Sequence, residues 1–136
     1  MAIFIGLDIG GARTGVAESD PSGSMAFPMV TVATDQLLDH LRQTYGDQEI
    51  AGVVVGEPKR LSGEATQGSA IVEAQVAKIR EAHPEWTFHM VDERFTSKIA
   101  AHAAAVSGAG KAVKKNKGLL DASAAAIILD SYLQQL

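Results

Sequence analysis

Residues 3–15 read IFIGLDIGGARTG, a run of apolar residues and glycine that leads through Asp8 into a glycine-rich turn. A run without polar alternation, such as residues 3–7, is typical of a strand that is buried on both faces of a sheet. Burial of an ionised carboxylate is costly unless a cation or hydrogen bonds compensate it. We therefore expect Asp8 to take part in chemistry. The alternative is a structural role, with hydrogen bonds from the turn amides of Gly10 and Gly11.

The remaining pattern predicts one α/β domain over residues 1–136. Strands at 16–19 and 29–32, separated by turn formers at 20–24, continue the first strand as an antiparallel meander. The elements expected next are a helix capped by Thr34 or Asp35 and ended by Gly46, a buried strand at 50–55, a helix that closes at His83-Pro84, a strand at 87–91, a short helix to about 106, a basic loop at 107–118 and a helix at 120–136. This order predicts a five-stranded mixed sheet, antiparallel in its first three strands and flanked by helices.

The composition narrows the chemistry. The chain has 136 residues, of which 46% are hydrophobic, so that it can build one real core. It has no cysteine, which excludes disulfides and thiolate zinc sites and leaves a metal to carboxylates or histidines. Hard ions such as Mg²⁺ are then the natural candidates. Without a bilayer-spanning stretch or a leader pattern, we expect a cytoplasmic protein with no membrane partner.

Further acids lie at the ends of apolar elements at two other places in the chain. Asp92 and Glu93 follow the expected fifth strand, and Asp121 shares the apolar face of the last helix. Each has an ordinary alternative, which is an ion pair with Arg94 for the first two and the helix dipole for Asp121. Taken together with Asp8 they predict a cation site, because clustered carboxylates repel one another unless cations lie between them.

Glu57 is one more acid at the end of a buried strand, held by the stiff bond to Pro58. Its alternative is a charge that faces solvent or pairs with Lys59. Carboxylates that converge on divalent ions can hold two metals, one activating water and the other stabilising the leaving oxygen of a phosphodiester. The acids therefore imply phosphoryl transfer.

The positions of the basic residues favour a nucleic-acid partner, although the net charge of the chain does not. The net charge is −4, which by itself argues against phosphate binding. An ordinary solvated surface is the alternative reading for any one of the basic residues. Nine of the 12 lysines and arginines nevertheless lie beside the motifs described here, namely Arg13, Lys59, Arg60, Arg94, Lys98, Lys111, Lys114, Lys115 and Lys117.

Five segments together resemble the YqgF/RuvX family of the RNase H-like superfamily. They are GLDIG (6–10), RTGVA (13–17), VVGEP (54–58), VDERFT (91–96) and KGLLDASA (117–124). The resemblance spans nearly the whole chain, and the motifs occur in order with suitable spacing. It implies an RNase H-like fold and a nuclease described as a Holliday junction resolvase homologue or as a processor of the 5′ end of the small-subunit ribosomal RNA precursor.

Carried over by motif, the resemblance implies that Asp8, Glu93 and Asp121 are the metal-binding catalytic acids. Asp92 lies in the same motif and could substitute. Glu57 departs from the family, which more often has an apolar residue before this proline. Whether Glu57 or Glu93 supplies the second acid of the superfamily, and whether Glu57 joins the metal site, stays open at this point.

The sequence and the resemblance thus predict an endonuclease that depends on Mg²⁺ or Mn²⁺ and acts on structured or single-stranded RNA or on branched DNA. Cleavage of both strands of a junction would need a homodimer. Two other classes stay open, a ribosome-assembly factor that binds nucleic acid but hardly cuts, and an actin-like phosphotransferase, against which the chain length weighs. The residues expected to hold phosphates are Arg13, Lys59, Arg94, Lys114, Lys115 and Lys117.

Overall fold

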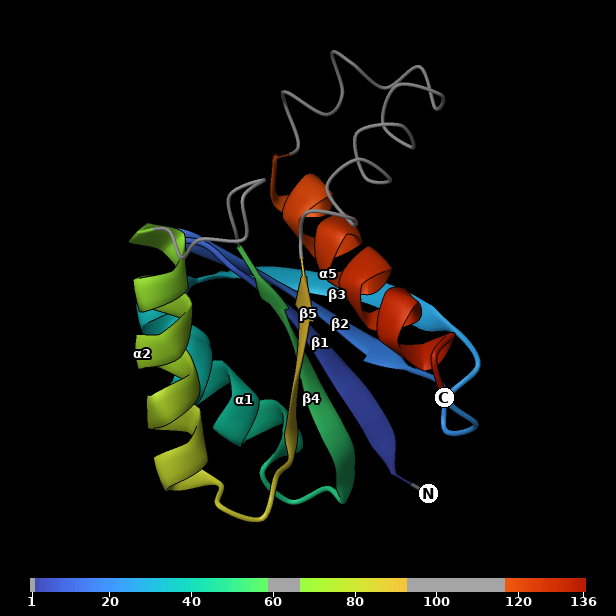
Figure 1. Cartoon of the computed structure of the whole chain (residues 1–136). Helices are drawn as coiled ribbons and strands as arrows, with labels where there is room; N and C mark the ends of the chain where they lie inside the picture. Colours follow the sequence, from blue (N-terminus) through green and yellow to red (C-terminus); the bar gives the residue numbers. More distant parts are fainter. Residues whose placement is uncertain (1, 59–66, 93–116) are drawn as a thin grey trace.

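A computed structural model describes residues 2–58, 67–92 and 117–136, including all side chains in these ranges except those of residues 67 and 117–121. It shows a five-stranded sheet with helices on both faces (Figure 1). The elements are β1 (Ile3–Ile9), β2 (Arg13–Ser19), β3 (Ala26–Ala33), the 3₁₀ turn η1 (Thr34–Gln36), α1 (Leu37–Tyr45), β4 (Ile50–Glu57), α2 (Gln67–Ala82), β5 (Phe88–Asp92) and α5 (Lys117–Leu133).

The strand order is β3-β2-β1-β4-β5, so the first strand of the chain is the central one. β1, β2 and β3 pair antiparallel, whereas β4 joins β1 and β5 joins β4 in parallel. The predicted mixed sheet with an antiparallel start is confirmed. A central strand is covered on both faces, which explains why the chain opens with an uninterrupted apolar run.

Two separate cores lie on the two faces of the sheet. On one face, α1 and α2 pack on Ile5, Leu7 and Ile9 of β1. On the other face, α5 packs on the sheet, with Ala125, Ile128 and Leu129 among the buried residues of that core. Figure 1 shows this division, with α1 and α2 on one side of the strands and α5 crossing the other. No helix within the described ranges is long and apolar enough to cross a membrane.

All five strands extend beyond the ranges that the apolar pattern predicted, and the extensions of β1 and β4 include candidate acids. β1 continues through Asp8 to Ile9, because Asp8 pairs with Gly15 and Ile9 with Thr14 across the hairpin. β4 likewise continues to Glu57, which pairs with Asp92. These acids are therefore the last or next-to-last residues of paired strands, instead of loop residues beyond them.

The predicted cap of the first helix was wrong. Neither Thr34 nor Asp35 caps α1 with its side chain; they belong to the 3₁₀ turn before it, and the hydroxyl of Thr34 donates to the carbonyl oxygen of Gly10. The predicted end is confirmed, since α1 stops at Tyr45 and Gly46 follows as its C-cap.

The last helix begins earlier than predicted. α5 starts at Lys117, so residues 117 and 118, which the sequence assigned to the basic loop, are helical, and the helix ends at Leu133. The rest of that loop and the predicted short helix to about 106 lie outside the described residues. The end of α2 at Ala82, shortly before Pro84, agrees with the predicted stop.

Candidate active site

Asp8 lies on the face of the sheet that α5 covers. Successive side chains of a strand project to opposite faces, and the neighbours Leu7 and Ile9 both belong to the core under α1 and α2. The half-buried Asp8 carboxylate therefore projects to the α5 side, together with the position of Gly6.

The positions on either side of Asp8 in the sheet carry no side chain. Gly15 of β2 is its direct partner across the hairpin. On the other side, Val55 of β4 pairs with Leu7, so Gly56 is the next β4 residue beside Asp8. A carboxylate between two glycines is accessible to a ligand from the α5 side without displacement of neighbouring strand side chains.

α5 runs antiparallel to β1 and lies very close to it. A Cβ at Gly6 would be 2.7 Å from the Cβ of Leu129 and 2.9 Å from the carbonyl oxygen of Ala125. Towards the start of β1, the ring of Phe4 contacts the ring of Tyr132, with centroids 5.7 Å apart. Residues nearer the N-terminus of β1 therefore contact residues nearer the C-terminus of α5.

This alignment carries position 121 of α5 towards Asp8. From the Gly6 contact, Asp8 is two residues further along the strand, or about 7 Å. Asp121 is four residues before Ala125, or about 6 Å along the helix in the same direction. It also shares the helical face of Ala125, because residues four apart lie one above the other. The backbone of position 121 is described, and its side chain is not.

Glu57 and Asp92 lie on the opposite face of the sheet from Asp8. Glu57 lines a shallow groove of about 290 Å³ with Val72, Val76 and Arg80 of α2. Asp92 is the direct partner of Glu57, and the preceding Val91 belongs to the core under α5. Strand alternation therefore turns both of these acids towards α2.

Only some of the other residues that the sequence singled out lie within the described ranges. Arg13 is exposed at the start of β2, and Lys117 begins α5. Within residues 2–58, 67–92 and 117–136, no three acid, histidine or cysteine side chains gather closely enough to hold a metal ion, and of the three expected ligands only the side chain of Asp8 belongs to this set. Outside the described residues lie Lys59, Glu93, Arg94, Lys114 and Lys115.

Comparison with known proteins decides the family. The family profile described as "RuvX: Holliday junction resolvase" matches residues 2–135. The chain belongs to the RuvX family. This confirms the resemblance seen in the motifs.

Relatives in the RuvX family match the chain over nearly its full length. A Flavobacterium psychrophilum protein named "Putative pre-16S rRNA nuclease" is 35% identical over 133 residues, which cover 98% of this chain and 97% of the relative. A Salinibacter ruber protein of the same name is 39% identical over 134 residues, with 98% and 94% covered. Among solved structures, Thermus thermophilus RuvC in complex with a Holliday junction substrate aligns with a TM-score of 0.59 at 14% identity, covering 99% of this chain and 96% of that one. This likeness confirms the predicted RNase H-like fold.

The sequence of this RuvX chain did not reveal that Thr34 binds the turn after Asp8. The Gly10 amide donates to the Arg13 carbonyl oxygen at 2.9 Å, which closes the turn. Thr34 binds this turn twice, through its hydroxyl to the Gly10 carbonyl oxygen at 2.6 Å and through its amide to the Ala12 carbonyl oxygen at 3.0 Å. These partners are too far apart in sequence for a local pattern to reveal them.

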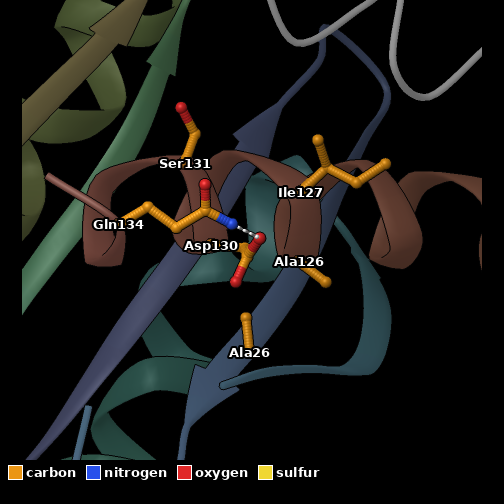
Figure 2. A pocket seen from close by; sticks show the side chains of 6 residues that line it. All are labelled: Ala26, Ala126, Ile127, Asp130, Ser131 and Gln134. Carbon is orange, nitrogen blue, oxygen red and sulfur yellow. Dashed lines mark hydrogen bonds between the residues drawn. The ribbon is translucent and has the colours of Figure 1, made fainter. Parts of the chain in front are cut away.

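A groove of about 400 Å³ between α5 and β3 is remote from the candidate site (Figure 2). On the α5 side of this groove, the side-chain amide of Gln134 donates to Asp130 at 2.7 Å. Ala26, the β3 residue of this groove, pairs with Ser19 of β2. The Ser19 hydroxyl accepts a hydrogen bond from the Phe4 amide, and Phe4 lies at the opposite end of β1 from Asp8. Its lining residues are Ala26, Ala126, Ile127, Asp130, Ser131 and Gln134.

Proposed function

We propose that this chain is a metal-dependent endonuclease that hydrolyses phosphodiester bonds during maturation of the 5′ end of pre-16S ribosomal RNA. Membership of the RuvX family and the names of its relatives support this activity. The observation that carries the proposal is the half-buried Asp8, which lies between two glycines on the sheet face where α5 brings position 121 towards it.

The donor set fits Mg²⁺ or Mn²⁺, since both ions prefer carboxylate oxygens. We assign Asp8, Glu93 and Asp121 as the residues that hold the metal. When bound, such an ion supplies the charge that activates water and stabilises the leaving oxygen. The protein would contribute three carboxylates from distant segments and, through Gly15 and Gly56, the room beside Asp8.

Strand alternation favours Glu93 over Asp92 as the second acid. The side chain of Asp92 lies on the α2 side, away from Asp8, and so does that of Glu57. Glu93, the other acid of the same family motif, is therefore the one we assign. We therefore propose that neither Glu57 nor Asp92 binds the catalytic metal, although each is the last residue of its strand.

Basic residues near the same end of the sheet would hold the substrate backbone. Arg13 is exposed at the start of β2, two residues before Gly15, which pairs with Asp8 across the hairpin. Phosphate contacts of this kind position a nucleic acid without reading its sequence and make binding weaken with salt. We assign the same role to Lys59, Arg94, Lys114, Lys115 and Lys117.

The test offers two substrates to the purified chain with Mn²⁺, an RNA that carries the 5′ leader of the 16S precursor and a four-way DNA junction. We expect cleavage of the RNA, loss of that cleavage in Asp8→Asn, and its retention in the matched control Asp92→Asn. Preferential cleavage of the junction would instead indicate a resolvase, for which light scattering should then show a homodimer.

A second candidate is a factor that binds RNA but does not cut it. The net charge of −4 and the additional acid Glu57 favour this candidate. It predicts salt-dependent RNA binding that persists when Asp8, Glu93 and Asp121 are all neutralised, with no cleavage by the wild-type chain in Mn²⁺. Mn²⁺ binding that is lost in the neutralised variant while the fold remains would favour the nuclease.

A further inference from the structure

Two buried threonine hydroxyls connect the end of β3 to the turn that follows Asp8. Thr14 is fully buried and Thr34 is 4% exposed, and their hydroxyl oxygens are 2.9 Å apart. The Thr34 hydroxyl is also 2.6 Å from the carbonyl oxygen of Gly10. Gly10 is two residues beyond Asp8, in the turn that also contains Arg13.

The chemistry of these groups fixes the direction of both hydrogen bonds. A carbonyl oxygen can only accept, so the single hydroxyl proton of Thr34 goes to Gly10. Thr34 then has no proton left for Thr14, and Thr14 must donate to Thr34. The result is one ordered chain of donors, from Thr14 to Thr34 to the Gly10 carbonyl oxygen, in which Thr34 is the central member.

We propose that Thr34 is a positioning residue, which fixes the β1–β2 turn and thereby the Asp8 carboxylate for metal binding. Thr34 approaches from the α1 side, as Thr14 pairs with Ile9 and Val32 of that core. Its hydrogen bonds to the turn go to backbone carbonyl oxygens, those of Gly10 and Ala12. The inference rests on the proposed nuclease function for its catalytic part, and on the hydrogen bonds alone for its structural part.

The test compares Thr34→Val, which keeps the shape but removes the donor, with Thr34→Ser, which keeps the hydroxyl. The matched control is Thr87→Val, because the Thr87 hydroxyl also donates to a carbonyl oxygen, that of Ala51 at 3.3 Å, near the opposite end of the sheet. Thr14→Val supplies a milder perturbation, since it leaves the Thr34 to Gly10 bond in place.

Three readouts distinguish positioning from general stability. In Thr34→Val we expect faster hydrogen exchange of the Gly10 amide, a higher Mn²⁺ concentration for half-maximal cleavage, and a kcat that is lower by about tenfold or more with little change in KM for RNA. Thr34→Ser should keep the wild-type value of all three readouts, and Thr14→Val should change them in the same direction as Thr34→Val but less. Thr87→Val should show none, even if its melting temperature falls.

Two results would overturn the proposal. Unchanged Gly10 exchange in Thr34→Val would show that the hydroxyl does not hold the turn. Faster exchange with unchanged kcat and Mn²⁺ dependence would show that the turn does not position Asp8. If the wild-type chain cuts no RNA, the nuclease proposal fails by itself, while the exchange measurement still decides whether Thr34 holds the turn.

Discussion

The backbone of Gly6 lies so close to α5 that a Cβ at this position would be only 2.9 Å from the carbonyl oxygen of Ala125. Real Cβ atoms do not approach backbone oxygens this closely, so only glycine at position 6 lets α5 pack this close to β1. The contact also sets how α5 lies along β1. It thereby relates Asp8, two residues along the strand, to Asp121, one helical turn before Ala125.

Gly6→Ala should therefore loosen the packing of α5. The added methyl group would meet the Cβ of Leu129 at 2.7 Å as well as the Ala125 oxygen, and overpacking of a core typically costs about 1–3 kcal/mol. Urea denaturation measures the loss in the free energy of unfolding. Gly11→Ala is the matched control, because its Cβ would meet only Ile71 at an ordinary 3.6 Å. Equal stability of the two variants would contradict the close approach.

The division of acids between the two faces predicts unequal effects of their neutralisation. Asp8→Asn should reduce cleavage about a hundredfold or more, because a direct metal ligand should matter at least as much as the groups that support ligands. Glu57→Gln and Asp92→Asn should stay close to the wild-type rate, since both side chains lie on the α2 face. A loss in Asp92→Asn comparable to that in Asp8→Asn, with the fold intact, would refute the face assignment.

Tyr45 of α1 stabilises the fold through its hydroxyl, which donates to the Glu18 carboxylate at 2.6 Å. Burial, followed by this hydrogen bond, raises the pKa of Tyr45 above its ordinary value of 10.0. A raised pKa in the folded state contributes stability that is fully present below pH 10 and is lost as the pH rises above it. Tyr45→Phe should lower the free energy of unfolding by about 1 kcal/mol near neutral pH.

The pH dependence of that difference provides the check. Chemical denaturation of wild type and Tyr45→Phe should give a difference in the free energy of unfolding that narrows above pH 10. A gap that stays constant into the alkaline range would contradict the shift.

Asp20 organises the turn between β2 and β3. Its carboxylate accepts hydrogen bonds from the Ser22 hydroxyl, from the Met25 amide at 2.8 Å and from Ser24, and these lower the pKa of Asp20 below its ordinary value of 3.8. A lowered pKa contributes stability that is present above 3.8 and is lost as the pH falls through the folded-state pKa.

We therefore expect Asp20→Asn to lower the urea midpoint at neutral pH, with a gap to wild type that shrinks in acid below 3.8. Asp47→Asn, at an exposed position after α1, is the matched control. A gap for Asp20→Asn that is equally large in acid and at neutral pH would show that the carboxylate charge does not hold this turn.

The sequence predicted the sheet well because its central strands are buried on both faces, which the apolar runs at 3–7 and 50–55 reveal directly. The strand ends were harder, since pairing with Gly15 carries β1 past Asp8 although the residue itself is a poor strand former. Thr34 shows the same limit. Local preference favours a helix cap, and a partner 24 residues away takes the hydroxyl instead.

The candidate site could be found from Asp8, because a carboxylate in a buried strand is unusual. The sequence left open which of the neighbouring acids joins it. A shift of one residue in strand register turns every side chain to the other face. The pairing of Glu57 with Asp92 shows that the two acids share a face, and the contact of Glu57 with the α2 groove shows which face it is. The approach of α5 at Gly6 depends on tertiary packing and has no local sequence signal.

We propose that Asp8 and Asp121, from the first strand and the last helix, hold one metal between the sheet and α5. A crystal soaked in Mn²⁺ and measured at the manganese absorption edge tests this directly, because the anomalous density locates the ion. We predict density on the α5 face within coordination distance of the Asp8 and Asp121 carboxylates. Density held by Glu57 and Asp92 on the α2 face, or none at Asp8, would contradict the account.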